Sequence, residues 1–538
     1  MKGDSLMKEI QIKNFRSLKD TGLQKLSPIT VLVGENSSGK STFLRAFPLL
    51  KQSISKRTSG PILWAGDVDD YVDFGSFEET ATNDGSNSIT FGFKFNINEF
   101  DGSRMYYTYD DFGNNVTIGN TNQDIFYEMT ICSSDVKDYV SSLVLTINNT
   151  QVHFDLEEMS VNTNGGLFYQ QPNDKTSALD SDLNNGVRYR PYFSFSRSFG
   201  FELPDIGGLF ERIAECINAR EKDAREWYDF RQMVCEIGAE LINNGRLSPL
   251  SEKKDNRRYS SSYIKLHNNL ISVIQAADNS GELEEICKLF FIYKFFMSTI
   301  DEFIYEYFKQ VHYIAPLRAT AERYYRLRNL AVDEVDYQGK NLPIFINSLT
   351  SKQLKTFQSW TNEHFGFSVS TDKSRGHLSL QIQLSGSDKK INLSDTGFGY
   401  SQVLPIITQL WELSSQKRNS SQRRAGVTQT IPLVIAIEQP ELHLHPAVQA
   451  RLAKAFIACI DLARKNKCEL QLLIETHSET IVNYFGRAIA RGMLKSEDVS
   501  VIMFEKGATE SITAVKNSSY DKDGFLLNWP YGFFDSED

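Results

Sequence analysis

The start of the chain carries two hydrophobic periods in succession. Apolar residues at Ile10, Ile12 and Phe15 alternate with polar ones, as in a half-buried strand. A second apolar run at residues 29–33 predicts a buried strand that leads directly into Gly34. After Lys40 the apolar positions recur at helical spacing and predict an amphipathic helix, at Phe43, Leu44, Phe47 and Leu50.

The middle of the chain changes its pattern twice. Residues 85–204 contain short β-rich runs between Asp, Asn and Gly clusters, which predict an antiparallel β-rich insert or arm. Residues 205–310 have apolar residues at helical spacing and predict a helical insert. Strand-like and helical segments alternate again over 311–538. We therefore expect one parent α/β domain, built from an N-terminal lobe at 1–84 and a C-terminal lobe at 311–538, which carries both inserts.

Composition places the protein among globular chains with more than one structural unit. The chain has 538 residues, of which 41% are hydrophobic and 23% charged. Its six cysteines include no CxxC pair, and no apolar run reaches the length of a signal peptide or membrane span. These features predict a cytoplasmic protein without membrane contact.

The charge balance limits nucleic-acid binding to local patches. The formal net charge is −10, which excludes a general nucleic-acid coat. Two groups of basic residues are candidates for a local contact, and for both we favour the simpler interpretation of a solvated surface. They are Lys253, Lys254, Arg257 and Arg258, and then Arg318, Arg323, Arg326 and Arg328.

Residues 34–41 read Gly-Glu-Asn-Ser-Ser-Gly-Lys-Ser and match G-x-x-x-x-G-K-[ST], the phosphate-binding loop. Glycines let such a loop curl so that its N–H groups point inward at phosphate, and the following helix adds the positive end of its dipole. Lys40 is expected at the β and γ phosphates and Ser41 at Mg²⁺. The motif predicts a site for ATP and Mg²⁺ at Gly34, Glu35, Asn36, Ser37, Ser38, Gly39, Lys40, Ser41 and Thr42.

Two later strands end in residues suited to the same site. The apolar run that begins at Ile431 ends at Glu438, a Walker B pattern in which the carboxylate holds Mg²⁺. A buried strand that merely ends at an acidic turn is the alternative, and the upstream P-loop favours the functional interpretation. The strand that begins at Leu470 leads to His477, a candidate switch residue for the γ-phosphate. A lone histidine is more often structural.

A Ser/Gly turn precedes the Walker B strand. Residues 393–402 read Leu-Ser-Asp-Thr-Gly-Phe-Gly-Tyr-Ser-Gln and enter a predicted helix. Such a turn offers N–H groups to an anion. On residue chemistry alone, an ordinary helix start capped by Ser401 is the favoured interpretation.

The order P-loop, Ser/Gly turn, Walker B and histidine resembles the ABC-type ATPase heads, including SMC-like and RecF-like proteins. The resemblance implies that the turn completes the ATP site of a second subunit, so that ATP lies between two heads of a homodimer or larger homo-oligomer. It makes Ser394, Gly397, Gly399 and Ser401 candidate contacts to the γ-phosphate in trans, without deciding between the two serines.

Three further segments resemble the PtuA-type ATPases of Septu and retron anti-phage systems. They are Glu438 to Pro446, Tyr313 to Arg318, and Trp529 to Asp535. The resemblance implies a role in antiviral defence with a PtuB-like HNH nuclease as partner, and in retrons also a reverse transcriptase with RNA-linked DNA. Two other interpretations stay open. One is a DNA-maintenance ATPase of the SMC/RecF-like group, although no long coiled coil is visible. The other is an OLD-like nuclease, although only about sixty residues follow His477.

One position departs from the ABC pattern. ABC heads usually place a catalytic glutamate directly after the Mg²⁺ carboxylate, and here that position is Gln439. A glutamine orients water but does not accept its proton, and loss of a general base costs about 10²- to 10⁴-fold in rate. Glu441 or the pair His443 and His445 are candidate substitutes, although an interface turn is the favoured role for the histidines. The sequence therefore predicts ATP binding with slow hydrolysis.

Overall fold

The computed structural model describes residues 7–56, 58–67, 70–82, 87–97, 123–171, 203–216, 224–247, 249, 261–277, 279–326, 332, 334–374, 376–415, 431–506 and 512–529. Outside these ranges lie Lys253, Lys254, Arg257, Arg258 and Arg328, and also residues 530–535 of the C-terminal motif. In the described part no helix is both long enough and apolar enough to cross a membrane.

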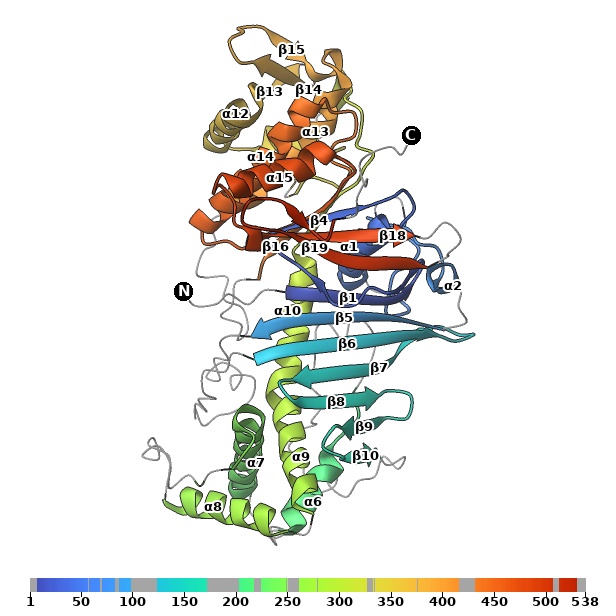
Figure 1. Cartoon of the computed structure of the whole chain (residues 1–538), viewed down its shortest axis with the longest axis vertical. Helices are drawn as coiled ribbons and strands as arrows, with labels where there is room; N and C mark the ends of the chain where they lie inside the picture. Colours follow the sequence, from blue (N-terminus) through green and yellow to red (C-terminus); the bar gives the residue numbers. More distant parts are fainter. Residues whose placement is uncertain are drawn as a thin grey trace.

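A seven-stranded sheet forms the middle layer of the molecule (Figure 1). Its order is β11 (Val311–Ile314), β16 (Leu433–Glu438), β17 (Leu470–Glu475), β4 (Ile29–Gly34), β18 (Val499–Lys506), β19 (Thr513–Tyr520) and β20 (Leu526–Leu527). The strands from β11 to β18 run parallel, and β19 and β20 are antiparallel to their neighbours. Every residue of β4, β16 and β17 is buried, because parallel strands are covered on both faces.

Alternate residues of these strands belong to two separate cores. In β4, Leu32 faces the first core, whereas Ile29, Val31 and Val33 face the second. Helix α1 (Lys40–Ser55) packs in the first core. Helices α13 (Phe398–Ser415), α14 (Pro446–Lys465) and α15 (Glu479–Ala490) contribute to the second. This layered arrangement confirms the predicted α/β fold.

A nine-stranded antiparallel sheet extends from the first core (Figure 1). It contains β1 (Met7–Phe15), β2 (Leu18–Asp20), β3 (Gln24–Lys25), β5 (Ser88–Ile97), β6 (Gln123–Ser133), β7 (Asp138–Ile147), β8 (Thr150–Asp155), β9 (Ser160–Thr163) and β10 (Phe168–Gln170). Strand β1 pairs with β5, so the N-terminal strand and the β-rich region form one continuous sheet. The short helix α2 (Phe77–Thr80) lies between them in the chain.

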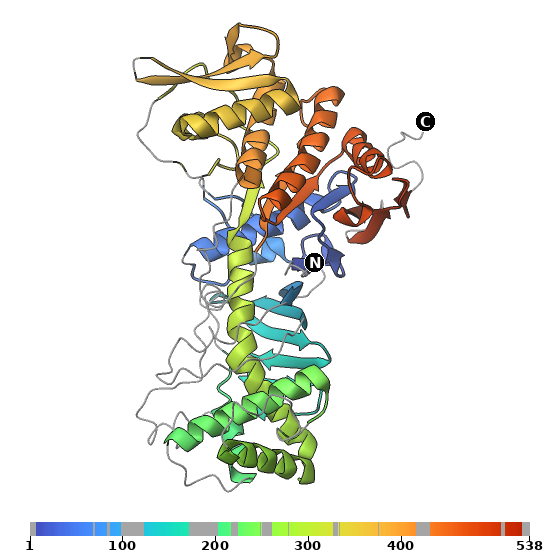
Figure 2. The same ribbon diagram turned by 90° about the vertical axis from the view of Figure 1, so that its left-hand side faces the viewer.

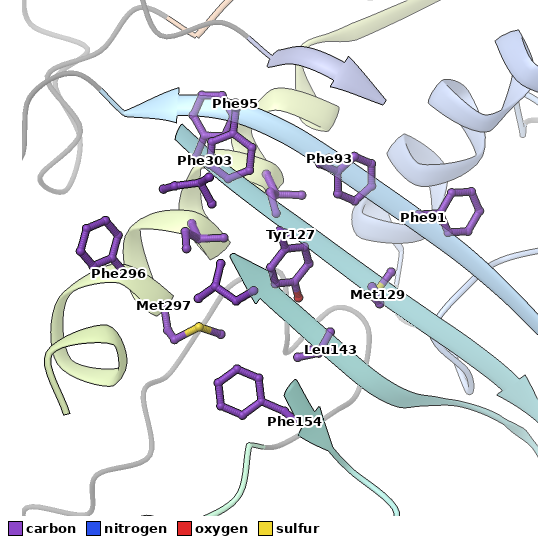
Figure 3. Close-up of a cluster of buried hydrophobic side chains, with 14 of the residues drawn as sticks. Phe91, Phe93, Phe95, Tyr127, Met129, Leu143, Phe154, Phe296, Met297 and Phe303 are labelled. Atoms are coloured by element: carbon purple, nitrogen blue, oxygen red, sulfur yellow. The ribbon is translucent and has the colours of Figure 1, made fainter. Parts of the chain in front are cut away.

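A long helical rod runs beside this sheet, as the two views show (Figures 1 and 2). It joins α9 (Ser280–Phe291), the π-helical turn η4 (Ile292–Phe296) and α10 (Met297–Lys309). At the distal end lie α6 (Gly207–Cys216), α7 (Ala224–Asn244) and α8 (Ser261–Ala276). Aromatic side chains pack the rod against the sheet. The ring centroids of Phe95 and Phe303 lie 4.5 Å apart (Figure 3). Those of Phe93 and Phe308 lie 5.3 Å apart.

A smaller sheet forms the lobe at the opposite end (Figure 1). It contains β12 (Tyr325–Arg326), β13 (Phe367–Ser374), β14 (His377–Leu384) and β15 (Lys390–Asn392). Helices α11 (Leu342–Ser348) and α12 (Ser351–Phe365) pack on it. The 3₁₀ turn η5 (Leu393–Asp395) follows β15, and the 3₁₀ turn η7 (Ser496–Asp498) precedes β18. Phe357, Val369 and Leu380 of this lobe belong to the second core.

Candidate functional site

The P-loop follows β4 at the carboxyl edge of the parallel sheet. Gly34 has φ 155° and Gly39 has φ 94°, and Ser37 also adopts a positive φ of 61°. A Cβ at Gly34 would lie 2.3 Å from the carbonyl oxygen of Phe504 in β18, so a side chain has no room there. Helix α1 begins at Lys40, which directs its N-terminus at the loop.

Lys40 is buried inside the loop, with 3% of its surface exposed. Its Nζ donates hydrogen bonds to the carbonyl oxygens of Gly34, at 3.0 Å, and Glu35, at 2.6 Å. Burial lowers the pKa of Lys40, while the nearby carboxylates, chiefly Glu475, oppose that shift. The ammonium group therefore lies where the β and γ phosphates of a nucleotide are expected.

A cavity of about 340 Å³ opens over this loop. Its volume lies within the range of small-ligand sites. The lining residues come from the loop, from the end of β17, from the turn after β16 and from the turn between β1 and β2: Arg16, Ser17, Asn36, Ser37, Ser38, Gly39, Lys40, Ser41, Thr42, Gln439, Glu475 and His477. The cavity brings together the P-loop from Asn36 to Thr42, Gln439 and His477.

Glu475 is a site residue that the sequence reasoning missed. The hydroxyl of Ser41 donates a 2.7 Å hydrogen bond to its Oε1 atom. Burial raises the pKa of Glu475 to about 7, and the charge of Glu438 adds to the shift. The available signal was a strand that ends in a carboxylate two residues before His477, the same pattern that pointed to Glu438.

Glu438 is held by a different set of partners. Arg45 of α1 donates to both of its carboxylate oxygens, at 2.6 and 2.8 Å, and the hydroxyl of Tyr313 donates to Oε1 at 2.7 Å. Arg318 donates to the backbone carbonyl oxygens of Glu438 and Gln439. The hydrogen bonds that Arg45 donates to Glu438 raise the pKa of the Arg45 guanidinium above its usual range. Glu438 does not line the cavity described above.

The turn after β16 places its predicted residues differently. Gln439 has φ 41° and lines the cavity. Glu441 is half-buried, and its Oε1 accepts a 2.6 Å hydrogen bond from the backbone N–H of His477. His445 caps α14, because its Nδ1 accepts from the N–H of Ala447. Glu441, His443 and His445 are not among the described cavity-lining residues, whereas His477 is.

Burial lowers the pKa of His477, and the charge of Lys40 lowers it further. A neutral imidazole is therefore favoured at neutral pH. It lines the cavity beside the P-loop, and a neutral imidazole has one ring N–H to donate to an anion. The hydrogen bond from the backbone N–H of His477 to Glu441 lets the turn after β16 position His477, which lies two residues after β17.

The Ser/Gly turn lies outside this cavity, since none of Ser394, Gly397, Gly399 and Ser401 lines it. Helix α13 begins at Phe398, so Ser401 lies within the helix and the expectation that Ser401 caps it is wrong. The cap of the preceding 3₁₀ turn is Asn392, whose Oδ1 accepts from the backbone N–H of Ser394 at 3.0 Å. Gly397 is exposed, and a Cβ there would meet nothing within 4 Å.

The structure places two arginines differently from the sequence predictions. Arg318 was a candidate for a basic surface patch, but it is 5% exposed and bonds to the turn after β16, so that assignment is wrong. Arg16 was not predicted at all. It follows β1 with φ 53°, its guanidinium lies 4.7 Å from the ring centroid of Phe74, and it lines the cavity. Arg16 adds a second cation to the cavity lining, beside Lys40 in the same set of residues.

The residues present fit Mg²⁺ and a nucleoside triphosphate. Ser38 and Glu475 both line the cavity, and the buried Oγ of Ser38 and Oε2 of Glu475 have no hydrogen-bond partner among the described residues. Ser41 and a carboxylate supply hard oxygen ligands of the kind Mg²⁺ prefers. Lys40, Arg16 and the helix N-terminus supply positive charge for phosphate.

The fold and this site define a P-loop ATPase of ABC/AAA-like type. Residues 7–482 match the family model described as the AAA ATPase domain, and the chain belongs to that family. Over 45 residues it is 49% identical to the OLD nuclease of Thermus scotoductus, a stretch that covers only 8% of either chain.

Two solved structures align with almost the whole length of this chain. The SMC head bound to the C-terminal winged-helix domain of ScpA is 12% identical, with a TM-score of 0.34, and the match covers 96% of this chain and 98% of that one. The SMC head domain from Thermotoga maritima is 8% identical, with a TM-score of 0.33, over 95% of this chain and 98% of that one.

Proposed function

We propose that this protein binds ATP with Mg²⁺ and hydrolyses it slowly, so that it works as a nucleotide-dependent switch. The observation that carries the proposal is the cavity itself, in which Lys40, Ser41, Glu475 and His477 converge while Gln439 occupies the position after Glu438. Mg²⁺ would neutralise charge on the phosphates when bound. Lys40 and Arg16 would hold the phosphates, and Gln439 would orient water without taking its proton.

The proposed working unit is a homodimer or larger homo-oligomer. Ser394, Gly397 and Gly399 lie outside the cavity of their own chain, and Gly397 is exposed. In this proposal the Ser/Gly turn of one copy covers the nucleotide of another, and Ser394 rather than the buried Ser401 contacts the γ-phosphate in trans. ATP binding and assembly would then be coupled.

The proposed cellular role is antiviral defence of the Septu or retron type. The segments 313–318 and 438–446 carry the resemblance, and the structure joins them through the hydrogen bonds of Tyr313 and Arg318 to Glu438. We propose that the ATP-bound assembly binds and restrains an HNH nuclease. In a retron it would also hold a reverse transcriptase with its RNA-linked DNA.

Binding and turnover are tested on the purified chain. We expect a fluorescent ATP analogue to bind in the presence of Mg²⁺, and turnover of wild type to be slow. Gln439→Glu should raise turnover by about 10²-fold or more, because it supplies the missing base. Wild-type turnover of tens per second, or a Q439E variant no faster than wild type, would remove the argument for a slow switch.

The partner is tested separately in the native host. Tagged protein should retain an HNH nuclease encoded beside its gene, and the retained amount should change when ATP binding is removed by Lys40→Ala. A chain with no neighbouring effector gene contradicts the defence role and leaves ATP binding intact.

The match to the OLD nuclease supports a second candidate, a nuclease activity of the chain itself. Metal-dependent DNA cleavage by the isolated protein would favour that candidate.

A further inference from the structure

Two glutamates compete for the role of magnesium carboxylate in this site. Glu438 and Glu475 are register partners at the ends of the adjacent parallel strands β16 and β17. We propose that Glu475, and not the Walker B-like Glu438, is the carboxylate that faces Mg²⁺ of the bound nucleotide. The inference rests on the proposed function and assigns the metal-facing residue within it.

The position of Glu475 meets the geometric requirements of that role. Its Oε1 already accepts a hydrogen bond from Ser41 Oγ, the hydroxyl that the P-loop places on Mg²⁺. Its Oε2 is buried and has no hydrogen-bond partner among the described residues. Glu475 is also the only carboxylate among the described residues that line the cavity. One oxygen is therefore beside the metal position, and the other has its hydrogen-bonding capacity unused within the described part of the chain.

The position of Glu438 is the opposite case. Both of its carboxylate oxygens are occupied by Arg45, and Oε1 also accepts from Tyr313. Arg45 comes from the second turn of α1 and Tyr313 from β11, so elements on both sides hold this carboxylate in place. To reach Mg²⁺, Glu438 would have to leave a bidentate ion pair in a buried setting, which is costly.

Strand order explains why the role falls on Glu475. Strand β17 lies directly beside the P-loop strand β4, whereas β16 lies one strand farther away. In this assignment Glu438 is a positioning residue. It anchors Arg45 of α1 and the edge strand β11 to the end of β16, and it keeps the P-loop helix in register with the sheet.

The test compares Glu475→Gln with the matched variant Glu438→Gln. Glutamine keeps the size of the side chain and a hydrogen-bonding oxygen but removes the charge that Mg²⁺ requires. The affinity for a fluorescent ATP analogue is measured with Mg²⁺ and with EDTA, and the paramagnetic resonance spectrum of Mn²⁺–ATP is recorded with each protein. Circular dichroism and thermal unfolding establish that both variants fold.

We expect wild type to bind nucleotide more tightly with Mg²⁺ than with EDTA. Glu475→Gln should lose about ten- to hundredfold of that gain and the protein-dependent change in the Mn²⁺ spectrum, whereas Glu438→Gln keeps both. The reverse pattern overturns the inference. Retention of the Mg²⁺ gain by Glu475→Gln with loss of turnover alone also overturns it, because Glu475 then acts on water. Wild type that binds no nucleotide in either buffer overturns the proposed function instead.

Discussion

At the scale of single residues, Gly34 shows most directly how the backbone builds the site. Its Cβ position lies 2.3 Å from the carbonyl oxygen of Phe504 and 2.8 Å from Ser38 Oγ. We predict that Gly34→Ala lowers ATP affinity by at least about tenfold and lowers the melting temperature, since the loop and β18 must both shift. Nucleotide titration and calorimetry measure the two effects.

Gly281 provides the control for that prediction. It lies near the start of α9, and a Cβ there would meet nothing within 4 Å. Gly281→Ala should therefore leave ATP affinity unchanged and stabilise the protein by about 0.5–1 kcal/mol. Equal effects of the two substitutions on ATP affinity would contradict the role given to Gly34.

A second residue-scale prediction concerns pH. His312 of β11 is buried, and burial lowers its pKa to about 4, with Glu334 opposing the shift and Lys51 adding to it. Its Nδ1 lies 3.1 Å from Gln409 Nε2 and 3.4 Å from Glu334 Oε2. Because the unfolded chain protonates this histidine near pH 6.5 and the folded chain near pH 4, the unfolded state binds more protons between these values.

Stability should therefore fall as the pH is lowered from about 6.5 to about 4, by about 3 kcal/mol from this residue at most. We predict that His312→Gln flattens the free energy of unfolding over that window, as measured by denaturant titration at a series of pH values. His377→Gln, at an exposed position on β14, should leave the slope unchanged. An unaltered slope in His312→Gln would show that other groups set the acid sensitivity.

At the residue scale, the sequence pointed to the part of the candidate site whose residues are consecutive in the chain. The P-loop spacing alone identified the loop that forms the cavity, because its glycines and Lys40 act within eight consecutive residues. It missed Glu475 and Arg16, whose roles depend on strands brought together from distant parts of the chain. It also could not show that Arg45 of α1 holds Glu438, a pairing across 393 positions.

At the scale of elements, the rod of α9, η4 and α10 determines how the β-rich region is held to the ATPase core. Phe303 stacks on Phe95 of β5, and Phe308 contacts both Phe93 of β5 and Phe47 of α1. Figure 3 shows Phe93, Phe95 and Phe303 between the sheet and the helix. One helix therefore touches the antiparallel sheet and the P-loop helix at once.

We predict that Phe303→Ala lowers the free energy of unfolding by about 3–5 kcal/mol, since it leaves a cavity in this interface. Phe168→Ala is the control, because Phe168 of β10 is 58% exposed and should cost much less. Denaturant titration measures both. Comparable destabilisation by the two substitutions would contradict the packing role of Phe303. If the proposed switch acts through the rod, Phe303→Ala will also reduce the effect of ATP binding on partner binding.

Element-scale prediction succeeded for strands with a strong hydrophobic pattern. The apolar runs at 88–95, 470–474 and 499–505 lie within strands β5, β17 and β18, and the run at 431–437 overlaps β16, which begins at Leu433. The pairing of β1 with β5 was not predictable, because a strand's own pattern shows which face is buried but not which distant strand lies beside it. The predicted boundary between the N-terminal lobe and the β-rich insert, at residues 84 and 85, therefore separates two strands, β1 and β5, that pair in one sheet.

At the scale of the whole molecule, the parallel sheet separates two halves with different contacts. The antiparallel sheet and the helical rod share the first core with α1, whereas the small lobe with β13 and β14 shares the second core with α13 and α14. Arg318 bridges the second half to the site, because its carbonyl oxygen accepts from Gln402 of α13 while its side chain holds the turn after β16. A contact at the start of α13 is therefore linked to Gln439 by two hydrogen-bonded steps.

Because of that linkage, the oligomeric state of the protein with and without ATP is the property to measure. If the Ser/Gly turn covers the nucleotide of a second copy, Mg²⁺–ATP should convert wild-type monomer to dimer. Light scattering after size-exclusion chromatography should show this shift with ATP and not with ADP. Ser394→Arg should abolish it, because Ser394 lies on the turn that precedes α13 and a bulky cation there would obstruct the approach of the other copy.

Ser387→Arg is the matched control for that experiment, since Ser387 is exposed in the same lobe between β14 and β15. It adds the same charge and bulk away from the Ser/Gly turn and should leave ATP-dependent dimerisation intact. Each variant should still bind ATP in its own P-loop, because neither residue lines the cavity. A Ser394→Arg protein that dimerises as wild type does would place the intersubunit contact elsewhere. The hydrogen-bonded link from α13 through Arg318 to Gln439 would then not be connected to a contact with the second copy.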